Sequence, residues 1–253
     1  MFRHKGKGRT YQHNLKLASI LSTVAGIVNI TGVLALNTLT TNITGHFAFF
    51  SEQLFLKDYS RALMFLMFIL CFLCGAFLSS LCIELTSKYK PHRSYVMPIL
   101  LEIGLMILLC VFEFYFKLHH LYPISTACVL LFTMGLQNAL VSRVSQSVVR
   151  TTHLTGLFTD LGIELSQLFY YKEQIQRNQL HQSIFLKVMI IAGFFSGGIV
   201  GGFVFMHLGL NTLMIPVGLL FFALWYDRLL FRFYYLKRKL RDHGYTGTLI
   251  RRH

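Results

Sequence analysis

Charged side chains are scarce in this sequence. They make up 13% of its 253 residues, about half the share usual in a soluble domain. Apolar residues account for 54% of the chain, which excludes a disordered chain and argues against a water-soluble globule. Acidic residues are fewest, 10 against 24 Lys and Arg, so the net charge is +14. In a soluble protein this charge would suggest nucleic acid. Here the basic residues lie between apolar runs, which is typical of a membrane protein, and we expect no nucleic-acid partner.

The motifs of common enzymes and pumps are also missing. No Walker loop, dinucleotide fingerprint, Ser-His-Asp order or H-E-x-x-H pair appears, which argues against ATP-driven pumping and the common hydrolases. The five cysteines all fall within apolar runs, where cysteine packs as a small apolar residue. Cys71-x-x-Cys74 is one helical turn and not a convincing redox or zinc motif. We therefore expect no enzymatic activity, no cofactor and no metal.

What the chain does contain is a series of long apolar runs. Several exceed the roughly 18 residues that a helix needs to cross a bilayer, and helices are required because a lipid-exposed backbone must satisfy its own hydrogen bonds. The first run is too long for the apolar region of a signal peptide, and no small-residue cleavage site follows it. The sequence predicts an all-α, polytopic membrane protein with six transmembrane helices at about 17–37, 62–85, 95–116, 123–142, 184–206 and 210–231.

The basic residues predict the orientation of these spans. With six spans, both termini lie on one side, and every Lys and Arg except Lys57, Arg61 and Lys117 falls on that side. Basic residues accumulate on the cytoplasmic side of membrane proteins, so we expect both termini to be cytoplasmic. Aromatic and basic residues alternate from Arg228 to Arg241, and this stretch could anchor on anionic lipid, but an ordinary basic flank after the last span is favoured. Residues 237–253 form the predicted basic cytoplasmic tail.

A duplicated motif divides the chain into two halves. Thr40–Gly45 (T-T-N-I-T-G) recurs as Thr151–Gly156 (T-T-H-L-T-G), and Gly26–Asn29 upstream recurs as Gly135–Asn138. Further matches join the small-residue runs 74–80 and 196–202, and the Pro positions 98 and 216. Four matches in the same order predict a first half at about 1–118 and a second half at 119–236, each with three helices, followed by the tail.

Because three spans is an odd number, consecutive copies must lie in opposite orientations. Inverted repeats of this kind build many secondary transporters, with the substrate site near the membrane midplane where the halves meet. A duplication that makes only a stable bundle is the alternative. The small residues of both halves are expected to allow close helix packing.

The two T-T-x-x-T-G segments are the predicted binding elements. Each follows a span and precedes an amphipathic stretch, the pattern of a broken or re-entrant helix. Gly45 and Gly156 permit backbone conformations closed to other residues, and threonine hydroxyls can cap a helix or line a polar path. Ordinary surface turns with helix caps are the alternative. The predicted substrate-binding residues are Asn29, Thr40, Thr41, Asn42, Thr44, Gly45, Asn138, Arg150, Thr151, Thr152, His153, Thr155 and Gly156.

The chemistry of these segments favours particular ligands. A short helix beginning at Gly45 or Gly156 would direct its positive N-terminal end at the break, which favours an anion, a carboxylate or a polar neutral molecule. Arg150, beside the second segment, would strengthen that preference. His46 and His153 could sense pH, although lining a polar path is favoured.

Other polar residues inside spans have two interpretations each. Asn29 and Asn138 could bind solute or join helices by hydrogen bonds worth about 1 kcal/mol. Glu102 is the only carboxylate well inside a predicted span, where a charge costs about 3 kcal/mol on insertion scales. It is a candidate for proton coupling, or a neutral acid hydrogen-bonded to a neighbouring helix. Its counterpart in the second half is Leu220, so any such role is asymmetric.

At these motifs the sequence resembles a known family. Gly26–Asn29 leading to Thr41–His46, and Met134–Ala139 leading to Arg150–Gly156, are similar to motifs of the YoaK-like family of uncharacterised bacterial multi-pass membrane proteins, over roughly 15–230. That family usually has Asp at the position of Asn29 and Asn at the position of His46. The resemblance implies six spans in the bacterial cytoplasmic (inner) membrane and implies no substrate.

Together these features predict a secondary transporter or permease for a small polar or anionic solute. The two breaks would form its outer and inner half-sites. A channel and a non-transporting membrane scaffold or assembly factor are the alternatives. The expected partners are a small molecule or ion and the lipid bilayer, and a homo-oligomer is left open.

Overall fold

The computed structural model describes residues 11–89, 94–116, 122–171 and 173–226, and all regular structure in these ranges is helical. The predicted tail at 237–253 lies outside them. After η3, a further helical segment occupies 214–226. The labelled helices are α1 (Tyr11–Leu36), α2 (Ile43–Phe55), α3 (Tyr59–Tyr89), α4 (Val96–Phe116), α6 (Pro123–Ser145), α7 (Leu154–Gln167), α8 (Gln174–Leu208) and the 3-10 helix η3 (Gly209–Leu213).

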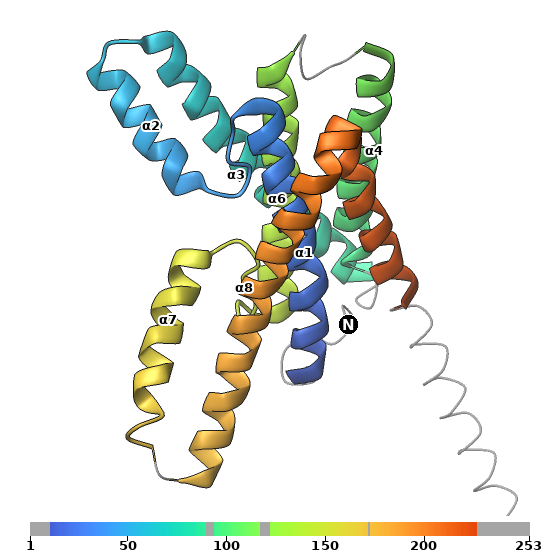
Figure 1. Cartoon of the computed structure of the whole chain (residues 1–253). Helices are drawn as coiled ribbons and strands as arrows, with labels where there is room; N and C mark the ends of the chain where they lie inside the picture. Colours follow the sequence, from blue (N-terminus) through green and yellow to red (C-terminus); the bar gives the residue numbers. More distant parts are fainter. Residues whose placement is uncertain (1–10, 90–93, 117–121, 172, 227–253) are drawn as a thin grey trace, which may run out of the picture.

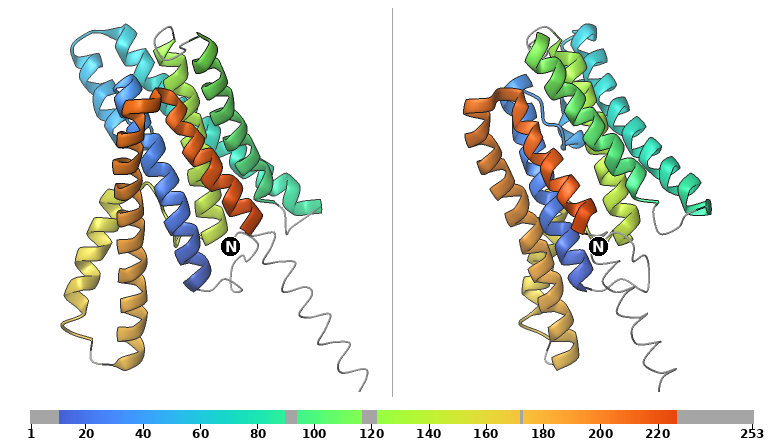
Figure 2. Two further views of the ribbon diagram at one scale, coloured as in Figure 1. Left: turned by 45° about the vertical axis from the view of Figure 1, so that its right-hand side comes forward. Right: turned by 90° about the vertical axis from the view of Figure 1, so that its right-hand side faces the viewer.

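Five helical stretches of the described chain are long and apolar enough to cross a membrane. The first four coincide with the first four predicted spans. The fifth covers both remaining predictions, because it contains α8, η3 and the segment 214–226, and the chain reverses direction at η3 (Figures 1 and 2). Residues 227–231 of the last predicted span lie outside the described residues. The five stretches are Tyr11–Leu36, Tyr59–Tyr89, Val96–Phe116, Pro123–Ser145 and Gln174–Tyr226.

Both T-T-x-x-T-G segments interrupt the helical path, as predicted. α1 ends before Asn37 and α6 ends before Gln146, and these two residues have left-handed backbone conformations with φ of 50° and 53°. The short helices α2 and α7 follow the breaks and lead into α3 and α8. They begin at Ile43 and Leu154, two residues before the glycines at which the sequence placed their starts.

The long helices pack as two pairs, and each pair joins one helix from each predicted half. α1 lies along α8, and α3 lies along α6. In Figure 1, α1 and α8 run upward from the lower end, whereas α3 and α6 run downward. The first helix of one half therefore packs against the helix that follows the break in the other half.

Glycine makes these close approaches possible. A Cβ atom at Gly26 would overlap the backbone carbonyl oxygen of Phe194 in α8, and one at Gly135 would overlap that of Phe72 in α3. Even a methyl group does not fit at either position. The close packing predicted for the small-residue runs 74–80 and 196–202 is confirmed at Gly75 and Gly197.

The partner helices contribute glycines to the same crossings. A Cβ at Gly197 would overlap the carbonyl oxygen of Thr23 in α1, and one at Gly75 would overlap that of Phe132 in α6. The contact positions correspond between the halves. The two helix pairs therefore use the same packing.

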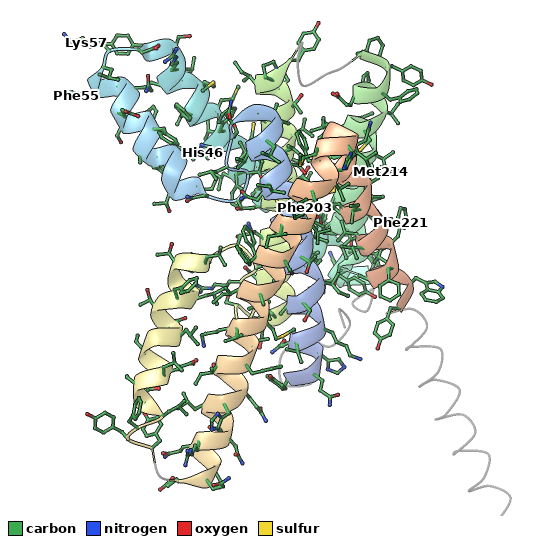
Figure 3. All side chains as sticks on the ribbon, viewed as in Figure 1. His46, Phe55, Lys57, Phe203, Met214 and Phe221 are labelled. Carbon is green, nitrogen blue, oxygen red and sulfur yellow. The ribbon has the colours of Figure 1, made fainter. Side chains whose placement is uncertain are left out.

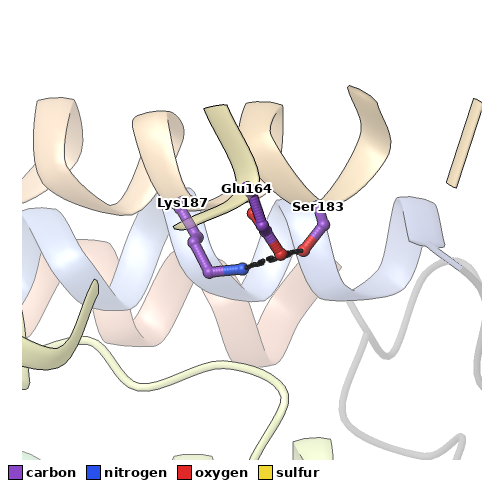
Figure 4. Close-up of polar contacts among 3 residues, drawn as sticks. All are labelled: Glu164, Ser183 and Lys187. Atoms are coloured by element: carbon purple, nitrogen blue, oxygen red, sulfur yellow. Dashed lines mark hydrogen bonds and ion pairs between the residues drawn. The ribbon is translucent and has the colours of Figure 1, made fainter. Parts of the chain in front are cut away.

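A polar cluster holds α7 against α8. Glu164 Oε1 accepts hydrogen bonds of 2.7 Å from Ser183 Oγ and from Lys187 Nζ (Figure 4). Both charged side chains are less than a fifth exposed. α8 has 35 residues, about 52 Å at 1.5 Å per residue, and its first ten residues are mostly polar. It therefore extends beyond the predicted span 184–206, and α7 packs beside this extension.

Two further contacts close the bundle. Gln137 Nε2 in α6 donates a 2.7 Å hydrogen bond to the Leu21 carbonyl in α1. Lys16 Nζ donates one of 2.7 Å to the Tyr226 hydroxyl. The start of the first span and the end of the described chain therefore lie on the same side of the molecule.

Candidate functional site

A cavity of about 880 Å³, here called the central pocket, lies where the two breaks meet. Its walls come from both halves: α1, the first break, α2 and α3 on one side, and α6, the second break, α7 and α8 on the other. Ten of the predicted substrate-binding residues line it. They are Asn29, Thr41, Asn42, Thr44, Gly45, Asn138, Arg150, Thr152, His153 and Thr155.

The same hydrogen bond fixes each break to the preceding helix. Thr41 Oγ1 donates to Asn29 Oδ1 at 2.9 Å, and Thr152 Oγ1 donates to Asn138 Oδ1 at 2.7 Å. Each asparagine thus joins its helix to the break that follows in the same half, whereas the structural interpretation expected hydrogen bonds between helices. Both asparagines also line the central pocket, so the same residues can contact a bound solute.

Two helices begin at the pocket wall. Asn42 is the N-cap of α2, and its Oδ1 accepts a 3.1 Å hydrogen bond from the Gly45 N–H. His153 is the N-cap residue of α7, and its side chain makes no capping hydrogen bond. The first turn of a helix carries unpaired N–H groups and a partial positive charge. Both ends that border the central pocket therefore favour negative charge there.

The predicted reason for glycine at 45 and 156 is wrong. Gly209 is the glycine with positive φ in the described chain, so neither motif glycine uses a conformation closed to other residues. Steric space explains them instead. A Cβ at Gly45 would lie 3.2 Å from Asn42 Nδ2, and one at Gly156 would overlap the His153 ring. In both halves the glycine makes room for the side chain of the N-cap residue.

Arg150 gives the wall of the central pocket a positive charge that no acidic lining residue balances in the described chain. Arg150 lines the central pocket and is exposed, and its guanidinium has no ion-pair partner among the described residues. The described lining contains no Asp or Glu. The position of Arg150 in the first half is occupied by Leu39, so the charge belongs to one wall of the pocket.

Four predicted residues do not line the central pocket. Thr40 and Thr151 are fully buried beside it, and neither hydroxyl has a hydrogen-bond partner in the described ranges. Gly156 lies beneath the His153 ring. Glu102 is fully buried in α4, and neither of its carboxyl oxygens has a hydrogen-bond partner within the described chain.

His46 is also placed differently from the prediction. It is 2% exposed and does not line the central pocket. Its Nε2 lies 2.7 Å from the Leu39 carbonyl oxygen, and because a carbonyl only accepts, Nε2 carries the proton. The ring packs edge-on against Phe68, with centroids 5.5 Å apart. His46 therefore anchors the first break to α3. Its counterpart in the second half, Leu157, is buried as well.

The predicted set omits seven residues that line the central pocket: Leu39, Ile43, Ala48, Phe72, Ser142, Leu154 and Phe194. Phe72 and Phe194 reach the central pocket from α3 and α8, and Ser142 reaches it from α6. Both phenylalanines lie three residues before the matched glycines at 75 and 197, so an extended alignment of the halves contained a signal for them. Ser142 is aligned with Val33 of the first half, and nothing in the sequence indicated that Ser142 lines the pocket. Among the described residues, no three His, Cys, Asp or Glu side chains are placed to hold a metal ion.

Comparison with known proteins identifies a family without a described activity. The family model described as "Protein of unknown function (DUF1275)" matches residues 17–226. No curated protein and no solved structure gives a significant match to the chain.

Proposed function

We propose that this chain, which belongs to the DUF1275 family of proteins of unknown function, is a secondary transporter or permease for a small polar or anionic solute. The observation that carries the proposal is the central pocket, where two helix breaks from different halves meet around a shared polar cavity. Broken helices whose ends meet at a substrate site are a common construction in secondary transporters.

The arrangement of the helices supports six spans in two inverted halves. The chain reverses at η3, so the fifth apolar stretch crosses twice in this proposal. The hydrogen bond between Lys16 and Tyr226 places the two ends of the spanning region together, as an even number of spans requires. α1 and α6 run in opposite directions (Figure 1) and make equivalent glycine contacts.

The two helix pairs supply a mechanism for alternating access. α1 with α8 and α3 with α6 are each joined at crossings where backbone meets backbone, so each pair moves as one body. The central pocket lies between the pairs, with Phe194 on one and Phe72 on the other. Rocking of one pair against the other opens the pocket first to one side of the membrane and then to the other, while the Thr–Asn hydrogen bonds hold both breaks in place.

Arg150 and the two helix ends select the solute. They place positive charge at the pocket, and the described lining offers no carboxylate to neutralise it. A carboxylate or another anion gains hydrogen bonds from the N–H groups at the helix starts and from the guanidinium. A cation gains none of these and is repelled.

Solute flux in proteoliposomes tests the proposal. We expect saturable uptake of at least one member of a panel of small anions and polar metabolites, and a large loss with Arg150→Gln. Arg61→Gln is the matched control, because Arg61 is exposed and pairs with Asp58 away from the pocket. Absence of flux across the panel contradicts the proposal, and unitary conductance in planar bilayers identifies a channel instead.

The proposal also includes a location and an orientation in the membrane. We assign the protein to the bacterial cytoplasmic membrane on its resemblance to the YoaK-like family. Both termini are assigned to the cytoplasm, because basic residues then accumulate inside. In this assignment the turn between α2 and α3, where Lys57 lies (Figure 3), faces the outside. A reporter inserted after Lys57 and one fused at the C-terminus must report opposite sides, and a shared side contradicts this topology.

A further inference from the structure

A second cavity of about 570 Å³ lies beside the central pocket. This cavity, here called the lateral groove, runs between α1 and α8, and Asn29 and Phe194 line both cavities. Asn29 is its one polar lining residue in the described chain. The remainder of its wall is glycine and large apolar side chains, including Leu34 and Met206.

Two glycines of α8 leave the space that forms the groove. A Cβ at Gly202 would lie 3.6 Å from Ile30 Cγ1, and one at Gly198 would lie 3.9 Å from the Gly26 carbonyl oxygen. Both distances are ordinary contacts, so larger residues are sterically permitted at the backbone. Phe203, shown on α8 in Figure 3, is 68% exposed and forms the outer edge of the groove. The groove therefore opens toward the lipid.

The equivalent place in the other helix pair is built differently. There Ala76 and Ser80 occupy the positions of Gly198 and Gly202. The positions of Leu34 and Met206 are occupied by Arg143 and Glu84, which form an ion pair. The apolar lining therefore does not follow from the shared packing of the two pairs. It is a property of the α1–α8 side alone.

From this asymmetry we propose that the transported solute is an amphiphilic anion with a single apolar chain. The acidic head lies in the central pocket and is paired with Arg150. The chain passes Asn29 and Phe194 and lies in the lateral groove. This inference rests on the proposed function and narrows its substrate class. An apolar cavity that shares the wall residues Asn29 and Phe194 with a positively charged one fits one molecule with two unlike ends, whereas a short anion occupies the central pocket alone.

Alkylsulfonates test the inference, because the sulfonate stays charged and chain length varies alone. Binding of methanesulfonate and hexanesulfonate to the purified protein in lipid nanodiscs is measured by calorimetry, with empty nanodiscs subtracted. Each methylene buried from water is expected to tighten binding, by up to about fourfold. Gly202→Leu fills the groove and is expected to remove this gain while leaving methanesulfonate affinity unchanged.

Gly218→Leu is the matched control. Gly218 is exposed, and no atom lies within 4 Å of a Cβ built there, so the same side chain is added to an open helix face away from the groove. We expect it to preserve the chain-length gain. A second variant, Leu34→Arg with Met206→Glu, introduces the ion pair of the other half and closes the groove by a different route, should Gly202→Leu fail to fold.

The outcomes separate the inference from the proposed function. If affinity does not increase with chain length, or if the groove variants and Gly218→Leu behave alike, the groove holds only membrane lipid and the inference is overturned. In that case methanesulfonate binding that depends on Arg150 still supports the proposed function. If neither sulfonate binds and no small anion is transported, both fail.

Discussion

Thr152 donates a 2.7 Å hydrogen bond to the side-chain carbonyl of Asn138, and the equivalent pair in the other half makes the same bond at 2.9 Å. Each bond joins a helix to the break that follows it, at the wall of the central pocket. The position of both breaks at the central pocket therefore depends on two matched contacts.

Removing either hydroxyl tests this dependence. Thr41→Val and Thr152→Val each delete a hydrogen bond worth about 1 kcal/mol while keeping the side-chain shape. We expect flux to fall severalfold, measured in proteoliposomes, with the melting temperature little changed. Thr159→Val is the control, because the Thr159 hydroxyl bonds only to the Thr155 carbonyl of its own helix. Unchanged flux in both variants would favour a scaffold over a transporter.

The glycine crossings make a prediction about stability. Gly26→Ala and Gly135→Ala each insert a methyl group into a backbone carbonyl, and overpacking of this kind costs about 1–3 kcal/mol or more. We expect similar falls in thermal stability in detergent, because the two sites are equivalent. Gly104→Ala is the control, since a Cβ there meets no atom within 4 Å. If all three variants melt alike, the crossings are not the closest contacts of the fold.

The cluster of Glu164, Ser183 and Lys187 predicts how α7 is held. Glu164→Gln leaves the Lys187 ammonium without its charged partner in a mostly buried place, which is costly. We expect faster amide hydrogen exchange across α7. Adding Lys187→Met should restore part of the protection, because neither charge then remains unpaired. An equal or greater loss in the double variant would contradict this account.

Glu102 yields a prediction about energy coupling. Its carboxyl group is fully buried without a hydrogen-bond partner in the described chain, so the neutral amide of Glu102→Gln fits the same space. If Glu102 carries the coupling proton, this variant loses uptake driven by a pH gradient but keeps solute exchange at equal pH. Glu102→Leu, which copies the buried Leu220 of the other half, should fold normally. Full gradient-driven uptake by either variant excludes the proton-coupling role.

Features with a local signal could be predicted from the sequence. Apolar runs located four helices closely, and the threonine and glycine motifs located both breaks. The hydrophobic length of a run decides whether it spans, and this is visible in any window of about 20 residues. The reason for the motif glycines was not visible, because the Asn42 and His153 side chains that need the space were not known to fold over them.

Features that depend on tertiary contact were not predictable. Nothing in the local pattern indicates that α1 pairs with α8 and not with α3, because each of the three helices contains a long apolar stretch. Glu164 and Lys187 lie on different helices, and their pairing requires knowing that α7 folds back along α8. His46 was read as polar lining because it adjoins the motif, but its position on the helix directs it to Phe68.

Each helix pair contains one helix from each predicted half, and this has a consequence for how the two halves arose. A three-helix unit produced alone would contain only one of the two helices that meet at each glycine crossing. It would have to intertwine with a second, upside-down molecule before any crossing could close. Fragments 1–118 and 119–253 should therefore be degraded when produced singly and accumulate when produced together, as expected if a gene fusion tethered what was once an obligate antiparallel dimer.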